Sequence, residues 1–525
     1  MGKPRGRHLA PSSRQVQNSL QHQGSLRSAI VWSYALKIGR FGITAVVSLL
    51  LARMVGPRAY GVVALALTLI VIVQALQNGL STALIQRSNL TDAHIDAGFW
   101  VVTASGLVLG GVAAALSPVW ANLMDLPELT WVCLALVPML LFQAMMVVPE
   151  AILRRSHNLR PVAVRTLIAS VVGGAVGIGL AIAGQTIWAL VAQQVVTAAT
   201  GAAVLWAVVS WRPRRRPSRQ ALSDLRDFSL KATAGIVGWT VGNRAGEFVT
   251  GRFFGPVAVG VYRLAGRLTD MAMELSVRAL QPVALADLAR VQDDRPAMVE
   301  RLTRLQHTAA LAGLPAFGIL AAGSDPLLAL LGPEWEPAAQ PLRILCLAAA
   351  LYIFRQLLGP ALEAMGRPGV LARFAWAYAL IACAAFVVTG LLTGQLTDVT
   401  QLAAISWTAV AIECLVTIPL AWYVMRRHLH SNLWRLIRPA VPAFVAGLAA
   451  AATHLISRRF DGLPVWWHLL AAGALGAAVA GLVLRLTDPT AMHYLRWLWA
   501  KVLRRQEPDS LVVTSADGRP SILTD

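Results

Sequence analysis

Runs of about twenty consecutive apolar residues recur along the whole chain. At about 1.5 Å of rise per helical residue, each run is long enough to cross a hydrocarbon core about 30 Å thick. Only 14% of the 525 residues are charged and 56% are hydrophobic, whereas a soluble domain carries roughly 25% charged residues. We therefore expect an all-α polytopic membrane protein with about fourteen transmembrane helices. The expected spans are 29–54, 61–85, 97–118, 129–150, 163–183, 187–210, 229–254, 257–283, 305–323, 338–361, 370–393, 402–425, 436–456 and 465–486.

One of these spans, 257–283, carries a stripe of charged side chains. They recur at steps of four, three, four and four residues, which places them within an arc of roughly 80° on a helix. A charge at membrane depth costs about 2.5 to 3.5 kcal/mol on insertion scales, so it persists only against a partner, a bundle interior or water. The stripe predicts a hydrated path, although an amphipathic helix on the membrane surface would share the pattern. Its members are Arg263, Arg267, Asp270, Glu274 and Arg278.

The basic residues of the loops favour a spanning helix at 257–283. Cytoplasmic loops of membrane proteins are enriched in Lys and Arg. If all fourteen segments span and the N-terminus is inside, the arginines of 154–160, 212–219, 290–304 and 426–427 fall on that side. Removing 257–283 from the count would move every later basic loop outside. We therefore expect this segment to span and both termini to be cytoplasmic.

An internal repeat predicts two related halves. Residues 52–62 (ARMVGPRAYGV) recur as residues 251–261 (GRFFGPVAVGV), with Arg, Gly, Pro, Ala, Gly and Val matched at an offset of 199. Because six helices separate the copies, the halves should share one orientation, as in parallel-repeat transporters. The expected domains are a basic tail (1–28), an N-lobe (29–210), a basic connector (211–228), a C-lobe (229–425), two appended helices (436–486) and a tail (487–525).

Charged and polar side chains at membrane depth are the candidate site residues. Arginine forks pair well with phosphate oxygens, so an excess of bases indicates an anionic, phosphate-bearing cargo. The alternative is that Arg244 with Glu247, and Arg267 with Asp270 and Glu274, are internal ion pairs that only hold the bundle. The bases at this depth are Lys37, Arg40, Arg244, Arg263, Arg267, Arg278, Arg343 and Arg355, the acids are Glu247, Asp270, Glu274 and Glu413, and Gln74 and Asn78 add a polar face to 61–85.

Several other kinds of site are not indicated. The ten histidines have no metal-ligand spacing, and the four cysteines form no CxxC pair, so we expect no metal. Neither a Walker A sequence nor a dinucleotide fingerprint is present, so no cofactor is expected. The net charge of +20 arises mainly from loop arginines rather than from a basic soluble module, which argues against nucleic acid as a partner.

Four segments carry a resemblance to a known family. LARMVGPRAYGVVAL (51–65), ALIQR (83–87), IWALVAQQ (187–194) and GPEWEP (332–337) together resemble the bacterial oligosaccharide flippases and polysaccharide exporters of the multidrug/oligosaccharidyl-lipid/polysaccharide exporter superfamily. The resemblance extends from about residue 28 to about residue 487. It implies two six-helix lobes, two appended helices and a cationic cavity lined by the first two helices of each lobe.

The resemblance also implies an activity in the bacterial inner membrane. The protein would move undecaprenyl-diphosphate-linked oligosaccharide units from the cytoplasmic to the periplasmic leaflet by alternating access, without being an enzyme. The family has no invariant motif to carry over, so position and charge select the candidates for contacts with the diphosphate or acidic sugars: Lys37, Arg40, Arg244, Arg263 and Arg267, with Arg278, Gln74 and Asn78 as further substrate-binding candidates.

The acids Glu247, Asp270, Glu274 and Glu413 would be candidates for binding a coupling proton or sodium ion. Membrane lipid, a polysaccharide polymerase and glycosyltransferases would be partners. The alternatives are a lipid II flippase, a multidrug antiporter of the same superfamily, and a membrane glycan polymerase or ligase. The last usually needs a large outer domain to hold acceptor and catalytic groups, and the longest outer loop expected here, near 323–337, is short.

Overall fold

The computed structural model describes residues 42–77, 92–155, 160–213, 219–394, 397–457 and 464–488, and the short segments 512–514 and 520–522. Lys37, Arg40 and Asn78 lie outside the described residues. We call 42–213 the first half of the chain and 219–488 the second half. Within these ranges, eleven helices are long and apolar enough to cross a membrane. The chain is therefore an all-α polytopic membrane protein, as its apolar runs predict.

From residue 97 onward most helices follow the expected runs, whereas the expected spans 29–54 and 61–85 meet in one helical segment and extend beyond the described residues. The first half contains the helical segment Gly42–Gln77, α2 (Asp92–Leu123), α3 (Glu128–Arg155), α4 (Arg160–Ile182) and α5 (Thr186–Val208). The second half contains α6 (Arg219–Ser276), η1 (Arg278–Leu280), α7 (Gln281–Ala289), α8 (Arg295–Ala322), α9 (Ser324–Ala329), η2 (Pro333–Ala338), α10 (Ala339–Gln356), α11 (Leu358–Ala364), α12 (Pro368–Thr393), α13 (Asp398–Tyr423), η3 (Val424–His428), α14 (Leu433–Ile437), η4 (Arg438–Ala440), α15 (Val441–Ala452), α16 (His454–Ser457) and α17 (Val465–Thr487).

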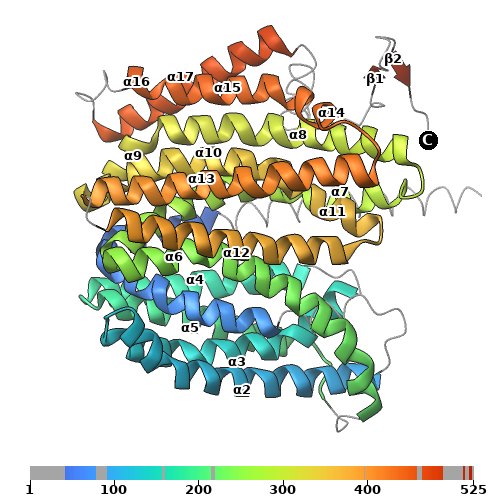
Figure 1. Ribbon diagram of the computed structural model, residues 1–525. Helices are drawn as coiled ribbons and strands as arrows, with labels where there is room; N and C mark the ends of the chain where they lie inside the picture. The colour runs from blue at the N-terminus through green and yellow to red at the C-terminus, as the bar shows by residue number, and fades with distance from the viewer. Residues whose placement is uncertain are drawn as a thin grey trace, which may run out of the picture.

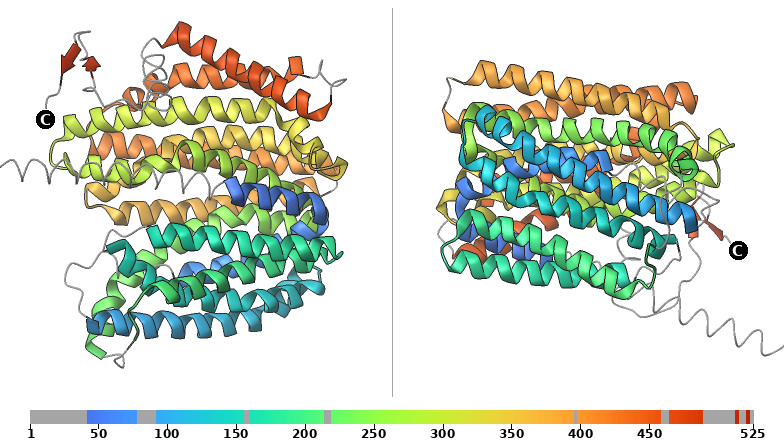
Figure 2. Two further views of the ribbon diagram at one scale, coloured as in Figure 1. Left: turned by 180° about the vertical axis from the view of Figure 1, so that it is seen from behind. Right: turned by 90° about the horizontal axis from the view of Figure 1, so that it is seen from below.

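The long helices lie side by side with their axes in roughly one direction (Figures 1 and 2). Helices α2 to α5 form one side of the molecule, and α15 and α17 form the opposite edge, where they cover α8 (Figure 1). The bent helix α6 begins beside α2 and runs up into the space between these two groups (Figure 1). Two short strands near the C-terminus, β1 (Val512–Thr514) and β2 (Pro520–Ile522), pair in antiparallel register with Val513 opposite Ser521.

The charged segment 257–283 differs from its expected form at its end. It follows 229–254 across a kink within α6, where Gly255 takes φ 79° and ψ −179°, at the Gly-Pro turn that the sequence repeat places there. The helix then ends at Ser276, and Arg278 begins the 3-10 turn η1. Arg278 is therefore not on the same regular helix as the other four charges. The expected span 436–456 is also interrupted, being divided among α14, η4, α15 and α16.

The two copies of the repeat meet each other directly. A Cβ atom on Gly61 would lie 1.7 Å from the carbonyl oxygen of Pro256, and one on Gly260 would lie 2.0 Å from that of Pro57. Only glycine allows both approaches. The contacts are reciprocal, as expected if the copies are related by a two-fold axis. We call these two turns, 56–61 and 255–260, the reciprocal junction.

Arginines at matched positions of the repeat extend this junction. Arg53 Nη1 donates to the carbonyl of Leu330 at 3.0 Å, so it crosses from the first half to the second. Arg252 Nη1, in the second half, donates to Asp125 Oδ2 in the first half at 3.4 Å. The indole of Trp335, which is 1% exposed, donates to the carbonyl of Ala52 at 3.2 Å. Five separate contacts thus join the halves at this end of the molecule.

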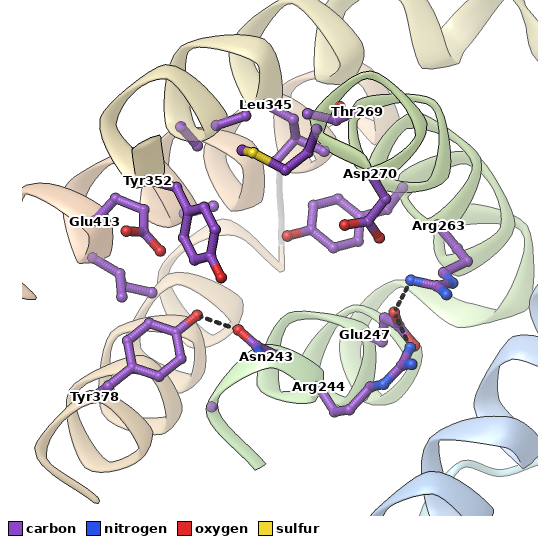
Figure 3. A pocket seen from close by; sticks show the side chains of 18 of the residues that line it. Asn243, Arg244, Glu247, Arg263, Thr269, Asp270, Leu345, Tyr352, Tyr378 and Glu413 are labelled. Atoms are coloured by element: carbon purple, nitrogen blue, oxygen red, sulfur yellow. Dashed lines mark hydrogen bonds and ion pairs between the residues drawn. The ribbon is translucent and has the colours of Figure 1, made fainter. Parts of the chain in front are cut away.

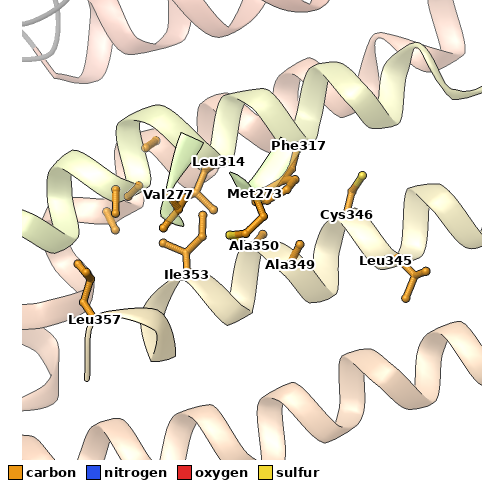
Figure 4. Packing of buried hydrophobic residues seen from close by; sticks show 14 of the residues in the cluster. Met273, Val277, Leu314, Phe317, Leu345, Cys346, Ala349, Ala350, Ile353 and Leu357 are labelled. Atoms are coloured by element: carbon orange, nitrogen blue, oxygen red, sulfur yellow. The ribbon is translucent and has the colours of Figure 1, made fainter. Parts of the chain in front are cut away.

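An apolar core holds the second half of α6 in place. Met273 of α6 and Val277, which directly follows α6, pack between Leu314 and Phe317 of α8 and Ile353 of α10 (Figure 4). Close packing leaves no space at Gly313, where a Cβ would lie 2.6 Å from Ile353 Cδ1. The charged side of α6 is consequently turned away from α8 and toward the cavities described next.

Candidate functional site

A cavity of about 410 Å³ lies among α6, α10, α12 and α13. We call it the charged chamber. Both halves of α6 contribute to it, because the bend at Gly255 folds the helix back beside itself (Figure 3). Its six charged lining residues balance, three bases against three acids: Arg244, Arg263, Arg278, Glu247, Asp270 and Glu413.

Glu247 is the centre of the best-connected network in this chamber. Its Oε1 accepts from Arg244 Nη1 at 2.7 Å and from Arg263 Nη1 at 3.1 Å. Its Oε2 accepts from Thr68 Oγ1 at 2.8 Å. The carboxylate side chain is only 5% exposed, whereas those of Arg244 and Arg263 are 18% and 25% exposed. Because Thr68 belongs to the first half, Glu247 links two arginines to each other and the two halves to each other.

The two acids of the charged stripe, Asp270 and Glu274, have a different partner from the one expected. Arg278 Nη2 donates to Asp270 Oδ1 at 3.0 Å, and Arg278 Nη1 donates to Glu274 Oε2 at 3.3 Å. The expected alternative of pairs between Arg267 and these acids is therefore not what the structure contains. The three side chains are 37 to 45% exposed, so these ion pairs contribute little stability.

A second ion pair closes the far side of the chamber. Arg355 Nη2 donates to Glu413 Oε1 at 2.7 Å, and both side chains are at least nine-tenths buried. The guanidinium carbon also lies 4.4 Å from the ring centroid of Trp239 and 4.6 Å from those of Tyr352 and Tyr378. A cation stacked on three rings and bound to a carboxylate is held firmly. Arg355 therefore braces the chamber wall.

A second cavity, of about 290 Å³, lies between helices of the first half and the second part of α6. We call it the glutamine chamber, because Gln193 and Gln194 of α5 line it. Hydroxyl groups add to its polar surface, and its only ionisable groups besides the phenol of Tyr60 are Arg263 and Arg267. Arg267 has no ion-pair partner among the described residues. Arg263 lines both chambers, so it forms part of the wall between them.

Among the remaining candidates from the sequence, two can be placed relative to the chambers and three lie outside the described residues. Gln74 is half-buried, about one helical turn beyond Val71, which lines the charged chamber. Arg343 lies outside both chambers, where it contacts Asp325 at 3.1 Å. Lys37, Arg40 and Asn78 cannot be placed against either chamber, since they lie outside the described residues.

The sequence does not single out some of the residues around the cavities as site candidates. Tyr378 donates to Asn243 Oδ1 at 2.9 Å within the charged chamber (Figure 3). Like Gln193, Gln194 and Thr68, both are uncharged residues in apolar helices, where a polar residue is most often a packing group. Their common feature is position: each faces a cavity or a buried charge, which only the packing of helices reveals.

Comparison with known proteins places the chain in a family. A family model described as a polysaccharide biosynthesis protein matches residues 50–340. The succinoglycan biosynthesis transport protein ExoT of Rhizobium meliloti is 26% identical over 88% of this chain and 93% of its own length. The teichuronic acid biosynthesis protein TuaB of Bacillus subtilis is 23% identical over 74% and 80%.

Solved structures share the fold. The lipid II flippase MurJ in an inward closed conformation superposes with a TM-score of 0.66 at 11% identity, over 90% of this chain and 100% of its own. An inward-facing multidrug transporter of the MATE family, from the MOP superfamily, gives a TM-score of 0.57 at 16% identity, over 75% and 98%. At these identities the likeness concerns the fold alone.

Proposed function

Because this chain belongs to the polysaccharide biosynthesis protein family, we propose that it translocates undecaprenyl-diphosphate-linked oligosaccharide units from the cytoplasmic to the periplasmic leaflet. The observation that carries this proposal is the pair of arginines facing the glutamine chamber. Arg267 has no acidic partner within the described part of the chain, and Arg263 also reaches the charged chamber. Two arginines, of which Arg267 has no acidic partner and Arg263 is shared with Glu247, suit a diphosphate joined to sugars when they lie beside amide and hydroxyl groups.

Alternating access requires two lobes that move against each other around the chambers. We take the first and second halves as lobes that rock about the cavities, with Gly42–Gln77 bending at Gly56 (φ +74°) into two spans and α6 bending at Gly255 into two more. Splitting Gly42–Gln77 raises the eleven candidate spans to twelve, and the two parts of α6 make fourteen. With the N-terminus inside, the reciprocal junction lies on the periplasmic side. The lipid tail would remain in the bilayer.

Glu247 has a specific part in this mechanism. In the protein without cargo, its carboxylate accepts hydrogen bonds from Arg244 and Arg263. A diphosphate would bind the same two guanidinium groups. An arriving diphosphate competes for these arginines and releases Glu247, together with its bond to Thr68 across the halves. Cargo binding is thereby linked to a change in the contact between lobes. The freed carboxylate could then take up a coupling proton or sodium ion, as could Asp270, Glu274 or Glu413.

Reconstitution tests the transport proposal. Proteoliposomes containing the protein and a fluorescent polyprenyl-diphosphate oligosaccharide should show flipping, and Arg263→Ala with Arg267→Ala should slow it at least about tenfold, the loss of roughly 1.4 kcal/mol of cargo interaction. The matched control is Arg154→Ala with Arg304→Ala, whose arginines only pair with a glutamate one turn away. If the Arg263/Arg267 variant flips the carrier at the wild-type rate, these arginines do not bind the diphosphate and the proposal is wrong.

A lipid II flippase remains the second candidate function, because that cargo carries the same diphosphate. The same vesicles loaded with lipid II distinguish the two cargoes: the proposal requires faster flipping of the oligosaccharide carrier. In the proposed pathway, glycosyltransferases build the cargo and a polysaccharide polymerase uses it, so both are expected partners. Co-purification with the protein would detect them.

A further inference from the structure

A third polar region lies away from both chambers, at the end of α13. One cavity of about 850 Å³ is lined by Arg367, Trp422, Tyr423, Arg426, Arg427 and His430. A smaller cavity of about 120 Å³ shares Arg367 and Arg427 with it and adds Arg295 and His428. We call the two together the basic cleft. Four arginines line it, and no carboxylate does.

One wall of the cleft is fixed by the end of α11. Gly366 takes φ +68°, its amide donates to the carbonyl of Glu363 at 2.9 Å, and the amide of Arg367 donates to that of Leu362 at 2.9 Å. This pair of bonds is a Schellman motif, which ends a helix in a defined geometry. The turn therefore sets where Arg367 stands at the cleft.

The opposite wall departs from regular helix in two places. The turn η3 at the end of α13 is a π-helix, in which the amide of Leu429 donates to the carbonyl of Val424 at 3.1 Å. His430 then takes φ +51°, a conformation that side chains with a Cβ adopt only at a cost. π-turns and strained residues concentrate at functional sites. Here both face the same cleft.

The cleft contains charge and hydrogen-bonding capacity without a matching partner. Arg367, Arg426 and Arg427 have no ion pair among the described residues. His428 is 7% exposed, and its buried Nε2 atom has no hydrogen-bond partner within that same part of the chain. Several cations around one cavity repel each other unless an anion lies between them. An anionic ligand would relieve this repulsion and give the His428 Nε2 atom a partner.

We propose that the basic cleft binds the phosphodiester headgroup of an anionic membrane phospholipid. Arginine forks and a histidine N–H are suitable donors for phosphate oxygens. Soluble phosphate has the same chemistry, but the surroundings favour a lipid. Leu415, Ile418 and Trp422 are 59, 51 and 50% exposed and follow one face of α13 to the cleft. They provide an apolar track for an acyl chain below a basic pocket, with an indole at headgroup level.

Counting bound lipids tests this site. Native mass spectrometry of the full-length protein in detergent, titrated with phosphatidylglycerol, should show one tightly bound lipid. We expect Arg367→Gln, Arg426→Gln and Arg427→Gln together to weaken its apparent Kd at least about tenfold. The control is Arg290→Gln, Arg435→Gln and Arg438→Gln, which removes the same charge from exposed arginines outside the cleft. It should change the Kd by less than about threefold.

Three results would overturn the proposal. One is equal binding of phosphatidylglycerol by the cleft variant and the control variant. Another is equal binding of phosphatidylcholine by the wild type. The third is displacement of the lipid by millimolar inorganic phosphate, which would make a soluble anion the ligand. If the triple variant fails to fold, Arg427→Gln alone, at an exposed residue shared by both cavities, should weaken binding several-fold in protein with an unchanged elution profile.

Discussion

Glu247 binds two arginines of the site and also joins the first half of the chain to the second. A buried carboxylate is costly unless charged partners and hydrogen bonds compensate for its lost hydration. Two arginines and a threonine hydroxyl do so here. The same bonds keep Arg244 and Arg263 from repelling each other. We infer that Glu247 acts as an internal anion that holds the arginines ready for a diphosphate.

Replacing Glu247 tests this role. Glu247→Gln keeps the side-chain volume but removes the charge, so we expect the empty protein to lose about 1 to 3 kcal/mol of stability. Added pyrophosphate should restore much of this loss, because it supplies the missing negative charge. The wild type should gain little from pyrophosphate. Thermal unfolding of the purified protein, with and without pyrophosphate, measures both effects.

Glu274→Gln is the matched control for this prediction. It makes the same chemical change on the same helix, but the Glu274 side chain is 45% exposed and only joins a pair with Arg278. Its stability and its response to pyrophosphate should resemble those of the wild type. Equal pyrophosphate stabilisation of the wild type and Glu247→Gln would contradict the internal-anion role.

At this scale the sequence indicates which residues are charged, but not how they are paired. Helical spacing placed Arg267, Asp270 and Glu274 on one face, so pairing among them was reasonable. The helix ends at Ser276, however, and Arg278 turns back to reach both acids. The packing around a helix determines the residue at which it ends. When that end moves by a few residues, a different arginine comes within reach of the acids, here Arg278 in place of Arg267.

Helices are the elements that the sequence predicts best, because the thickness of a bilayer sets their length. The expected spans 163–183 and 465–486 agree with α4 (Arg160–Ile182) and α17 (Val465–Thr487) within a few residues. The bend in α6 also had a signal, the repeated Gly-Pro. The interruption of 436–456 also has a signal, because Pro439 and Pro442 lie at the starts of η4 and α15, where a proline ends or kinks a preceding helix.

Glycines of α6 provide a prediction about helix contacts. Gly260→Ala should destabilise the protein by about 1 to 3 kcal/mol, because its Cβ would lie 2.0 Å from the carbonyl oxygen of Pro57. Gly266→Ala should be neutral or stabilising by up to about 1 kcal/mol, since nothing lies within 4 Å of the added Cβ. Thermal unfolding in detergent compares the two variants. Equal stabilities would mean that the reciprocal junction does not pack as described.

The whole molecule is joined at the reciprocal junction through contacts that occur in pairs. Each half contributes a glycine, a proline carbonyl and an arginine to the other half. Alternating access requires these contacts to break together when the lobes open on that side. Exposed ion pairs are individually weak, as are single hydrogen bonds to a carbonyl. We therefore expect loss of the arginines to change the population of open molecules without unfolding the protein.

Arg53→Ala with Arg252→Ala tests this arrangement. Spin labels at Arg58 and Val257, exposed positions just after the two prolines, report the separation of the turns in a background without the four native cysteines. We expect the wild type to show mainly a short distance and the double variant to gain a longer one, at roughly tenfold higher population if about 1.4 kcal/mol is lost. The control, Arg154→Ala with Arg301→Ala, removes ion pairs within single halves and should leave the distances unchanged. If the double variant keeps only the short distance, the glycine and proline contacts hold the junction closed without the arginines.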